Sequence, residues 1–169
     1  MKDLMVKKSY AKVNIFLKIV NKRGNYHELV SRFIRVHNLY DIMSFIKTSR
    51  KAITIIGDFG CKMETNTVYK AYKLIEHYEG VKNFFENHTI KIEKKIPEFA
   101  GLGGGSSNAA TFLIMANEYC NLNLSKQDLC DISIQIGADV PFFIYEYDSA
   151  IVEYEVFRYF KNFGYKKSK

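Results

Sequence analysis

The stretch "PEFAGLGGGSSNAATFLIMA", from Pro97 to Ala116, constrains the fold more than any other part of the sequence. Four glycines occupy five consecutive positions, Gly101 and 103–105, and two serines and an apolar run with helical spacing follow them. Glycine tolerates positive φ and lets a backbone approach a ligand closely. This pattern predicts one of three things: an anion-binding turn, a flexible hinge or a tight structural corner.

The flanking segments favour the anion-binding turn. Residues 88–97, "HTIKIEKKIP", alternate through Ile90 and Ile92 and predict a strand that runs into the glycines. Residues 109–119 predict a helix. A helix N-terminus after such a loop offers free N–H groups and the positive end of its dipole to an anion. Ser106 and Ser107 would add hydroxyls at the mouth of the loop, although both also suit helix capping.

Two well-known phosphate loops do not match this stretch. The P-loop pattern requires a lysine after the glycines, and none is present. The dinucleotide-binding pattern requires a glycine at the position of Ser106. On spacing alone, a flexible structural turn therefore stays open as an alternative.

The N-terminal part of the chain predicts a sheet. Residues 9–20 alternate, with Val13, Ile15, Leu17 and Ile19 on one face, which is typical of a half-buried strand. A turn follows at residues 24–25. Residues 31–48 and 52–58 are rich in β-forming residues and continue the predicted sheet.

Two further helices and one aromatic segment are predicted around the glycine stretch. Residues 64–80 have helical spacing, with Thr65 or Asn66 as the N-cap and Gly80 as the end. Residues 125–137 begin with a capping box and end at a glycine. Residues 138–147, "ADVPFFIYEY", predict a sharp turn followed by an aromatic strand. The result is an α+β domain with several strands and about three helices.

Length and composition limit the class of protein. A chain of 169 residues with 47% hydrophobic residues fits one domain with an ordinary core. It has no apolar run long enough for a membrane span, and charges interrupt its N-terminal apolar segment, so no signal peptide is expected. The three cysteines lack metal-ligand spacing and predict buried, reduced thiols in a cytoplasmic protein. The net charge of +7 is compatible with nucleic acid, but its scattered lysines favour small anionic ligands such as nucleotides.

Three segments together resemble the GHMP kinase superfamily. They are "AKVNIFLKI", "PEFAGLGGGSSNAA" and "IGADVPFF", in this order. With "GNYHEL" and "LYDIMSF", the match extends over residues 9–153 and is most similar to the branch that phosphorylates cytidine diphosphate-linked methylerythritol in non-mevalonate isoprenoid synthesis. The resemblance implies an N-terminal, ATP-binding GHMP domain at residues 1–153. Its α+β fold would be similar to the second domain of ribosomal protein S5.

The resemblance also implies a reaction and a site. The γ-phosphoryl group of ATP would pass to a hydroxyl of this small-molecule substrate, with Mg²⁺ accompanying the ATP and no dedicated metal site among the carboxylates. Lys12 and Asp139 match the catalytic pair, with Asp139 as the base. Asn14, two residues from Lys12 on the same strand face, matches a substrate contact, and Tyr26 and His27 match the pair that recognises cytidine. The implied ATP-binding residues are Asn66, Lys94, Pro97, Glu98, Phe99, Ala100, Gly101, Leu102, Gly103, Gly104, Gly105, Ser106 and Ser107.

The chain departs from the family pattern in two places. Phe99 stands where the family loop usually has a small residue, so its ring is expected either to cover the nucleotide or to narrow the pocket. Residues 154–169 form an aromatic and basic segment in place of the expected family continuation. We expect this segment to be foreign to the family, as after a frameshift, and the C-terminal GHMP domain to be absent, which would impair turnover.

Two other functions stay open from the sequence. One is another GHMP kinase, acting on homoserine, mevalonate or a sugar. The other is a nucleotide- or RNA-binding module with an S5-like fold.

Overall fold

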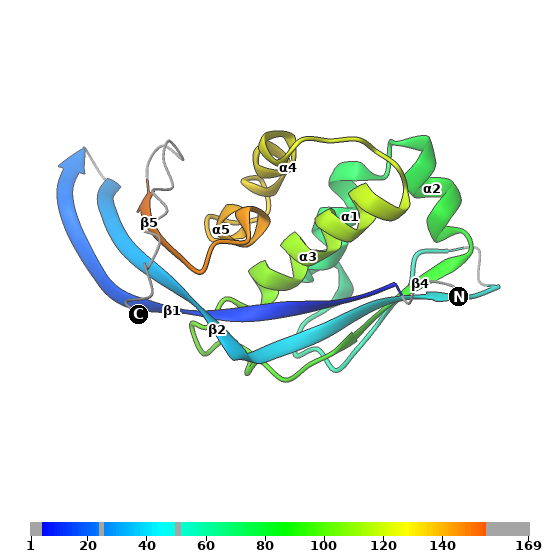
Figure 1. Ribbon diagram of the computed structural model, residues 1–169, viewed down its shortest axis with the longest axis horizontal. Helices are drawn as coiled ribbons and strands as arrows, with labels where there is room; N and C mark the ends of the chain where they lie inside the picture. Colours follow the sequence, from blue (N-terminus) through cyan, green and yellow to red (C-terminus); the bar gives the residue numbers. More distant parts are fainter. Residues whose placement is uncertain (1–4, 24–25, 50–51, 155–169) are drawn as a thin grey trace, which may run out of the picture.

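A long antiparallel hairpin forms the framework of the molecule. The computed structural model describes residues 5–23, 26–49 and 52–154. Strand β1 (Val6–Arg23) pairs with β2 (Tyr26–Lys47) along most of its length. Both curve across the molecule beneath the helices (Figure 1). The sheet predicted over residues 9–20 and 31–48 is confirmed, whereas the turn predicted at residues 24–25 lies outside the described part.

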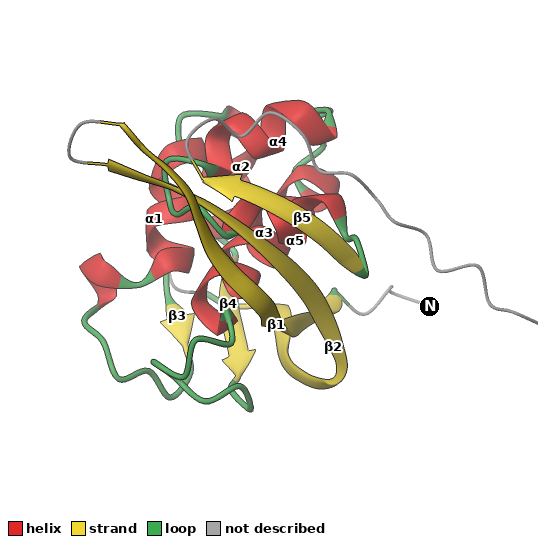
Figure 2. Cartoon of the chain, turned by 90° about the vertical axis from the view of Figure 1, so that its left-hand side faces the viewer, coloured by secondary structure: helices red, strands yellow, loops and turns green. Residues whose placement is uncertain are grey.

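The other strands are short and extend the sheet from the edge of β2 opposite β1. Strand β4 (His88–Glu93) runs antiparallel to β2, and β3 (Ile55–Ile56) runs parallel to β4. Strand β5 (Ser149–Tyr154) pairs with the first half of β2. All helices cover one face of this sheet, as the view rotated by 90° shows (Figure 2). The strand predicted at residues 52–58 therefore exists, but it is only two residues long.

Register shifts divide β1 into segments that face different ways. The pairing with β2 shifts between Tyr10 and Ala11 and again between Asn14 and Phe16. A bulge of one residue reverses which side chains face the core. Ala11 and Lys12 are consequently both buried, while Ile15 is 56% exposed. The continuous apolar face predicted from Val13 to Ile19 is thus interrupted at the second shift.

The described residues contain five α-helices and one short 3₁₀ helix, more than the three that were predicted. The elements are η1 (Met63–Thr65), α1 (Thr67–Ile75), α2 (Glu79–Phe85), α3 (Gly104–Tyr119), α4 (Lys126–Ser133) and α5 (Val140–Tyr145). The helix predicted over residues 64–80 is really two helices, and Gly80 lies inside α2 rather than at a helix end. A Cβ at Gly80 would stand 2.6 Å from the Cys120 carbonyl oxygen, so glycine permits close packing there.

Helix α5 (Val140–Tyr145) occupies most of residues 138–147, so the aromatic strand predicted there is wrong. Pro141 lies in the first turn, where its fixed φ suits a helix and its missing N–H costs nothing. Phe142 and Ile144 are fully buried, and the Phe142 ring lies 5.3 Å from that of Phe33 in β2. Burial of these side chains against the sheet outweighs the strand preference of aromatic residues.

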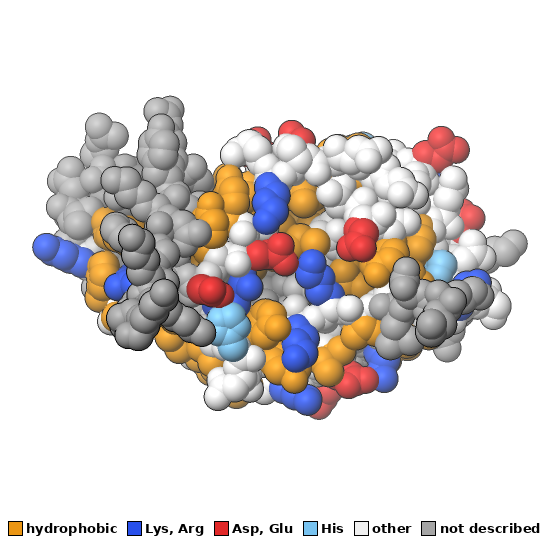
Figure 3. Space-filling view, in the orientation of Figure 1, with side chains coloured by type: hydrophobic (Ala, Val, Ile, Leu, Met, Phe, Trp, Pro, Cys, Tyr) orange, Lys and Arg blue, Asp and Glu red, His pale blue; other side chains and the backbone are white. Residues whose placement is uncertain are grey.

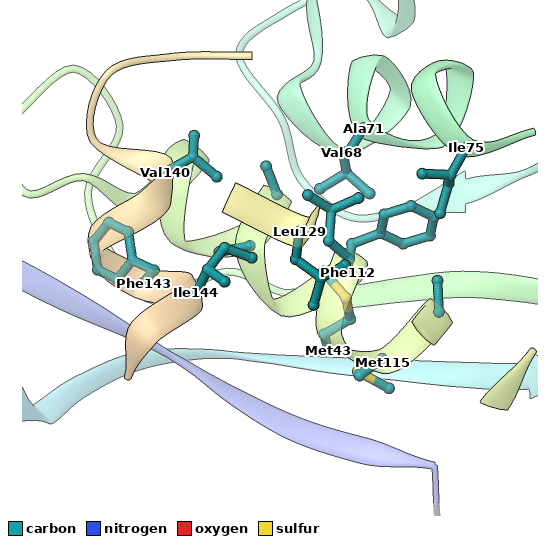
Figure 4. Packing of buried hydrophobic residues seen from close by; sticks show 14 of the residues in the cluster. Met43, Val68, Ala71, Ile75, Phe112, Met115, Leu129, Val140, Phe143 and Ile144 are labelled. Atoms are coloured by element: carbon teal, nitrogen blue, oxygen red, sulfur yellow. The ribbon is translucent and has the colours of Figure 1, made fainter. Parts of the chain in front are cut away.

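The core lies between the sheet and the central helix α3. Phe112 packs among Val68, Ile75 and Met43, which come from α1 and β2 (Figure 4). Helix α4 ends at Ser133, four residues before the predicted Gly137, although its predicted capping box is confirmed. Among the described residues, no helix has both the length and the apolar character needed to cross a bilayer. The core therefore holds α3 against α1 and β2, and this packing positions the N-terminus of α3.

Candidate functional site

One large cleft, about 710 Å³ in volume, contains most of the predicted site. Its walls are the glycine loop before α3, the segment before α1, and the adjoining parts of β1 and α5. The lining residues are Lys12, Phe59, Gly60, Cys61, Thr65, Asn66, Thr67, Lys94, Pro97, Glu98, Phe99, Ala100, Gly101, Leu102, Gly103, Gly104, Gly105, Ser106, Asn108 and Asp139.

The glycines form the first turn of α3 as well as the loop before it. The helix begins at Gly104, five residues before the predicted start, and Gly103 caps it at φ 70° without a side-chain hydrogen bond. The first intrahelical bond runs from the Ser107 N–H to the Gly103 carbonyl oxygen at 2.8 Å. The N–H groups of Gly104, Gly105 and Ser106 precede that bond, so no intrahelical acceptor is available to them. They line the cleft as a cradle for an anion.

Packing leaves little room for a side chain at two of the glycines. At Gly103, an added Cβ would lie 3.0 Å from both Lys12 Cγ and Phe143 Cζ. At Gly104, it would lie 3.0 Å from a methyl carbon of Ile96. Gly101 has positive φ but nothing within 4 Å of its ideal Cβ position. The loop thus presses directly onto β1 and α5, where the predicted catalytic residues lie.

Lys12 and Asp139 form an ion pair at one end of the cleft. Lys12 Nζ lies 3.2 Å from Asp139 Oδ2, and the two side chains are 5% and 25% exposed. Lys12 Nζ also donates to Asn14 Oδ1 at 2.6 Å and stands 4.4 Å above the Phe33 ring. The structure therefore brings three sequence-predicted residues together, although their chemical roles stay predictions.

A backbone bond joins the ion pair to the glycine loop. The Lys12 N–H donates to the Leu102 carbonyl oxygen at 2.9 Å. This bond fixes the position of β1 relative to the anion cradle. Asp139 is the residue immediately before α5, and its carboxylate faces Lys12.

Lys94 is tied to a buried carboxylate that the sequence reasoning missed. Its ammonium forms an ion pair with Asp41, which is fully buried in β2. Asp41 also accepts hydrogen bonds from the N–H groups of Lys95 and Ile96, at 2.6 and 2.8 Å. Asp41 thus holds the segment that leads into Pro97. The sequence analysis included Asp41 in the motif "LYDIMSF" but gave it no role.

Asn66 combines two functions that the sequence left as alternatives. Its Oδ1 accepts from the Val68 N–H at 2.9 Å, so it is the N-cap of α1, and it also lines the cleft. The neighbouring Thr67 was not predicted. Its hydroxyl donates to the Gly105 carbonyl oxygen at 2.7 Å and so fastens α1 to the glycine loop.

The two serines after the glycines face in different directions. Ser106 lines the cleft. Ser107 is buried and accepts a hydrogen bond from the Ser9 hydroxyl at 2.9 Å, so its predicted place at the mouth of the loop is wrong. Asn108, which was not predicted, lines the cleft and is 3% exposed. Among the described residues, its Oδ1 has no hydrogen-bond partner.

The remaining predicted residues lie in different surroundings. Tyr26 and His27 begin β2 opposite Arg23 and Lys22, and their side chains lie outside the described part. Cys61 is exposed at the cleft, contrary to the predicted burial of all three thiols, while Cys120 and Cys130 are buried.

Burial has a direct effect on the two core thiols. Loss of hydration disfavours the charged thiolate and raises the pKa of Cys120 to about 12 and that of Cys130 to about 11. Both thiols therefore stay protonated at neutral pH.

The chain is similar in sequence to known kinases. Residues 66–147 match the family described as GHMP kinases N terminal domain. Over 152 residues, the chain is 55% identical to the 4-diphosphocytidyl-2-C-methyl-D-erythritol kinase of Sulfurimonas denitrificans, covering 86% of this chain and 57% of the relative. The kinase of the same name from Helicobacter pylori is 40% identical over 148 residues, covering 83% and 54%. The chain thus spans little more than half the length of the curated relatives it matches.

Solved structures show the same fold. A crystal structure of 4-(cytidine 5'-diphospho)-2C-methyl-D-erythritol kinase matches with a TM-score of 0.75 and 31% identity, over 94% of this chain and 55% of that chain. Mevalonate kinase from Methanococcus jannaschii matches with a TM-score of 0.63 and 15% identity, over 96% and 56%, a likeness in fold alone. The predicted α+β fold of a GHMP kinase N-terminal domain is confirmed.

Proposed function

The chain contains the N-terminal domain of a GHMP kinase, and from this premise we propose that it serves the ATP-dependent phosphorylation of 4-diphosphocytidyl-2-C-methyl-D-erythritol. One observation carries the proposal: the Lys12–Asp139 ion pair closes one end of the cleft that the glycine loop lines. Phosphoryl transfer depends on a phosphate clamp, a group that activates the hydroxyl, and positive charge beside the reacting phosphate. All three features meet in this cleft.

Each residue of the pair has a role that its contacts support. The Asp139 carboxylate accepts the proton of the substrate hydroxyl as that oxygen attacks the γ-phosphorus. The Lys12 ammonium stabilises the negative charge that develops on the transferred group. Asn14 holds the Lys12 ammonium in place through its 2.6 Å hydrogen bond. The free N–H groups at the start of α3 bind the phosphates.

The cleft also suits Mg²⁺ bound together with ATP. The carboxylate of Asp139 and the buried Oδ1 of Asn108, which has no hydrogen-bond partner within the described part of the chain, are oxygens of the kind that Mg²⁺ prefers, directly or through water. Mg²⁺ usually binds through one or two carboxylates and the substrate phosphates, so it needs no dedicated protein cage. The described residues contain no cluster of three or more His, Cys, Asp or Glu side chains. When bound, Mg²⁺ would neutralise charge on the phosphates.

The choice of substrate rests on the names of the relatives and on two predicted residues. Tyr26 and His27 begin β2, at the distal end of the long hairpin. We assign them to the cytidine ring, with Tyr26 stacking on it and His27 hydrogen-bonding it. Cytidine nucleotides should then compete with the substrate. Phosphorylation of homoserine or mevalonate, unaffected by cytidine nucleotides, would contradict this assignment.

An RNA-binding function is less well supported. On the face shown in Figure 3, blue Lys and Arg side chains alternate with red Asp and Glu side chains among the described residues. A nucleic-acid surface usually gathers its basic residues into a patch or stripe. The chain has a net charge of +7, but the basic side chains visible on this face do not form such a patch.

The test measures phosphoryl transfer from ATP to 4-diphosphocytidyl-2-C-methyl-D-erythritol by the purified 169-residue chain. The affinity of the chain for ATP is measured in parallel by calorimetry. Asp139→Asn should lower kcat by a factor of about 10²–10⁴ and leave the Kd for ATP within about threefold. Lys12→Met should lower kcat similarly. Lys126→Met is the control, because Lys126 is an exposed lysine that pairs with Glu146 and does not line the cleft.

Each outcome bears on the proposal. Loss of turnover in the two cleft variants, with normal turnover in the control, supports it. A rate unchanged by Asp139→Asn contradicts the role of the base. If the folded chain binds no ATP, the proposal is wrong altogether. If it binds ATP but does not phosphorylate the substrate, the residues of this chain are not sufficient for catalysis.

A further inference from the structure

Two phenylalanines line the cleft at the end formed by the segment before α1. Phe59 belongs to that segment and Phe99 to the glycine loop. Phe59 is partly buried and packs against the hydrophobic core, whereas the Phe99 side chain is 92% exposed. An aromatic ring so fully in contact with water gains free energy when a ligand covers it. The cleft therefore has an apolar rim beside its phosphate cradle.

The backbone holds Phe99 in this exposed position. Its φ is 58°, a left-handed conformation that bulky residues rarely adopt. The preceding Glu98 accepts a hydrogen bond from the Gly60 N–H at 2.7 Å, which joins the two loops. A Cβ at Gly60 would lie 3.7 Å from Phe99 Cε2, so the ring stands directly beside the Gly60 backbone. Such strain persists where the surrounding structure maintains it, and here the Glu98–Gly60 bond is the restraint.

The two ends of the cleft differ in chemistry. At Gly103, the loop touches Lys12, which pairs with Asp139, so this end suits the transferred phosphate and the attacking hydroxyl. At Phe99, four residues earlier, the loop touches the Gly60 segment, and the rim is aromatic. A nucleotide has the same polarity, with charged phosphates at one end and a flat base at the other. Only one orientation places its base beside Phe99.

We propose that Phe99 is a positioning residue that stacks on the base of the bound nucleotide, held in place by the Glu98–Gly60 hydrogen bond. This inference rests on the proposed function and adds a determinant of nucleotide affinity that lies outside the phosphate cradle. Stacking on an aromatic face contributes to binding with little preference for the base. ATP and GTP should therefore benefit alike, and a ligand without a base should not benefit.

The first experiment compares ATP with inorganic tripolyphosphate, which carries the phosphates without a base. In Phe99→Gly, the Kd for ATP should rise about tenfold, within the range that base stacking contributes. The Kd for tripolyphosphate should stay within about twofold. Glycine accepts a φ of 58° readily, so the variant relieves backbone strain and is expected to fold. Phe16→Ala, at a phenylalanine of β1 that is 42% exposed and does not line the cleft, is the control.

A second experiment gives a direct signal from the ring. The chain contains no tryptophan, so Phe99→Trp introduces a single fluorescent reporter at this position. Its emission should change on addition of ATP or GTP and stay constant with tripolyphosphate. In Glu98→Ala, ATP should bind several-fold more weakly than in the wild type. Glu98→Gln should restore most of the affinity, because its amide oxygen still accepts from the Gly60 N–H.

The outcomes separate this inference from the proposed function. If the wild type binds ATP and Phe99→Gly binds it equally well, the stacking role is wrong while the proposed function stands. If Phe99→Gly weakens ATP and tripolyphosphate to the same degree, Phe99 supports only the phosphate cradle, and the inference is again overturned. If the folded wild type binds neither ligand, both proposals fail.

Discussion

Replacing Asp41 by alanine should be one of the most destabilising single changes outside the apolar core. The side chain is fully buried and binds the Lys94 ammonium and the N–H groups of Lys95 and Ile96. The substitution leaves the Lys94 side chain, which is only 10% exposed, without its carboxylate. Removing one partner of a buried ion pair costs about 3–5 kcal/mol. We therefore expect a loss of about 4 kcal/mol in the free energy of unfolding, a large share of the roughly 5–15 kcal/mol typical of a domain.

Urea unfolding followed by circular dichroism measures this loss. Asp41→Asn keeps the shape and one acceptor oxygen for the two N–H groups but removes the charge, so it should cost about half as much. The control is Asp148→Ala. Asp148 pairs with His37 at 3.0 Å, but both side chains are largely exposed, at 77% and 63%. This solvated pair should contribute less than about 1 kcal/mol.

A loss below about 1 kcal/mol for Asp41→Ala would refute the reasoning, as would a loss equal to that of Asp148→Ala. Either result would mean that the segment before the glycine loop is held by its apolar contacts and that the carboxylate is dispensable. A loss near the expected value, accompanied by weaker ATP binding, would show that Asp41 also positions the loop.

Glycine, cap and cysteine positions give further testable expectations. Gly103→Ala should lower the free energy of unfolding in urea by about 2 kcal/mol, because the new Cβ would stand at a positive φ and make two contacts of 3.0 Å. Gly101→Ala, at a positive φ but without such contacts among the described residues, should lower it by about 1 kcal/mol. Asn66→Ala should cost about 1 kcal/mol through loss of the α1 cap, visible in the same assay. The Cys120 thiol ionises near pH 9 in the unfolded chain and only near pH 12 in the fold, so the unfolded state loses its proton first. Unfolding free energy should therefore fall between about pH 9 and 12, by up to about 1.4 kcal/mol per pH unit from this group, and Cys120→Ala should reduce that slope. Ellman's reagent should modify the exposed Cys61 at once and the buried thiols only on unfolding.

Elements with a strong local pattern were predictable from the sequence. The strand β1 and the capping box before α4 follow from local properties of the chain, and both were confirmed, although a register shift interrupts the predicted apolar face of β1. Helix α5 was not predictable in this way, because its six residues carry aromatic side chains that locally favour a strand. Only its burial against β2 and α3 makes the helix the better solution, and that information is tertiary.

The same distinction applies to the site. The glycine loop and the Lys12–Asp139 pair were accessible through the resemblance to the GHMP kinases, and the structure brings them into one cleft. Asp41 was not, because its partners lie more than fifty residues further along the chain. Ser107 was assigned to the wrong side because α3 begins at Gly104 rather than near Asn108. The face that a residue presents on a helix depends on the helix start and on packing, which a motif does not contain.

The bond from the Lys12 N–H to the Leu102 carbonyl has a consequence for native-state hydrogen exchange. This amide belongs to β1, yet its acceptor belongs to the glycine loop. Its deuterium uptake therefore reports the opening of that loop, while neighbouring amides paired with β2 report the opening of the hairpin. A nucleotide that closes the cleft should slow exchange at this single amide more than at its neighbours. The exchange rate of the Lys12 amide thus measures how readily the glycine loop opens.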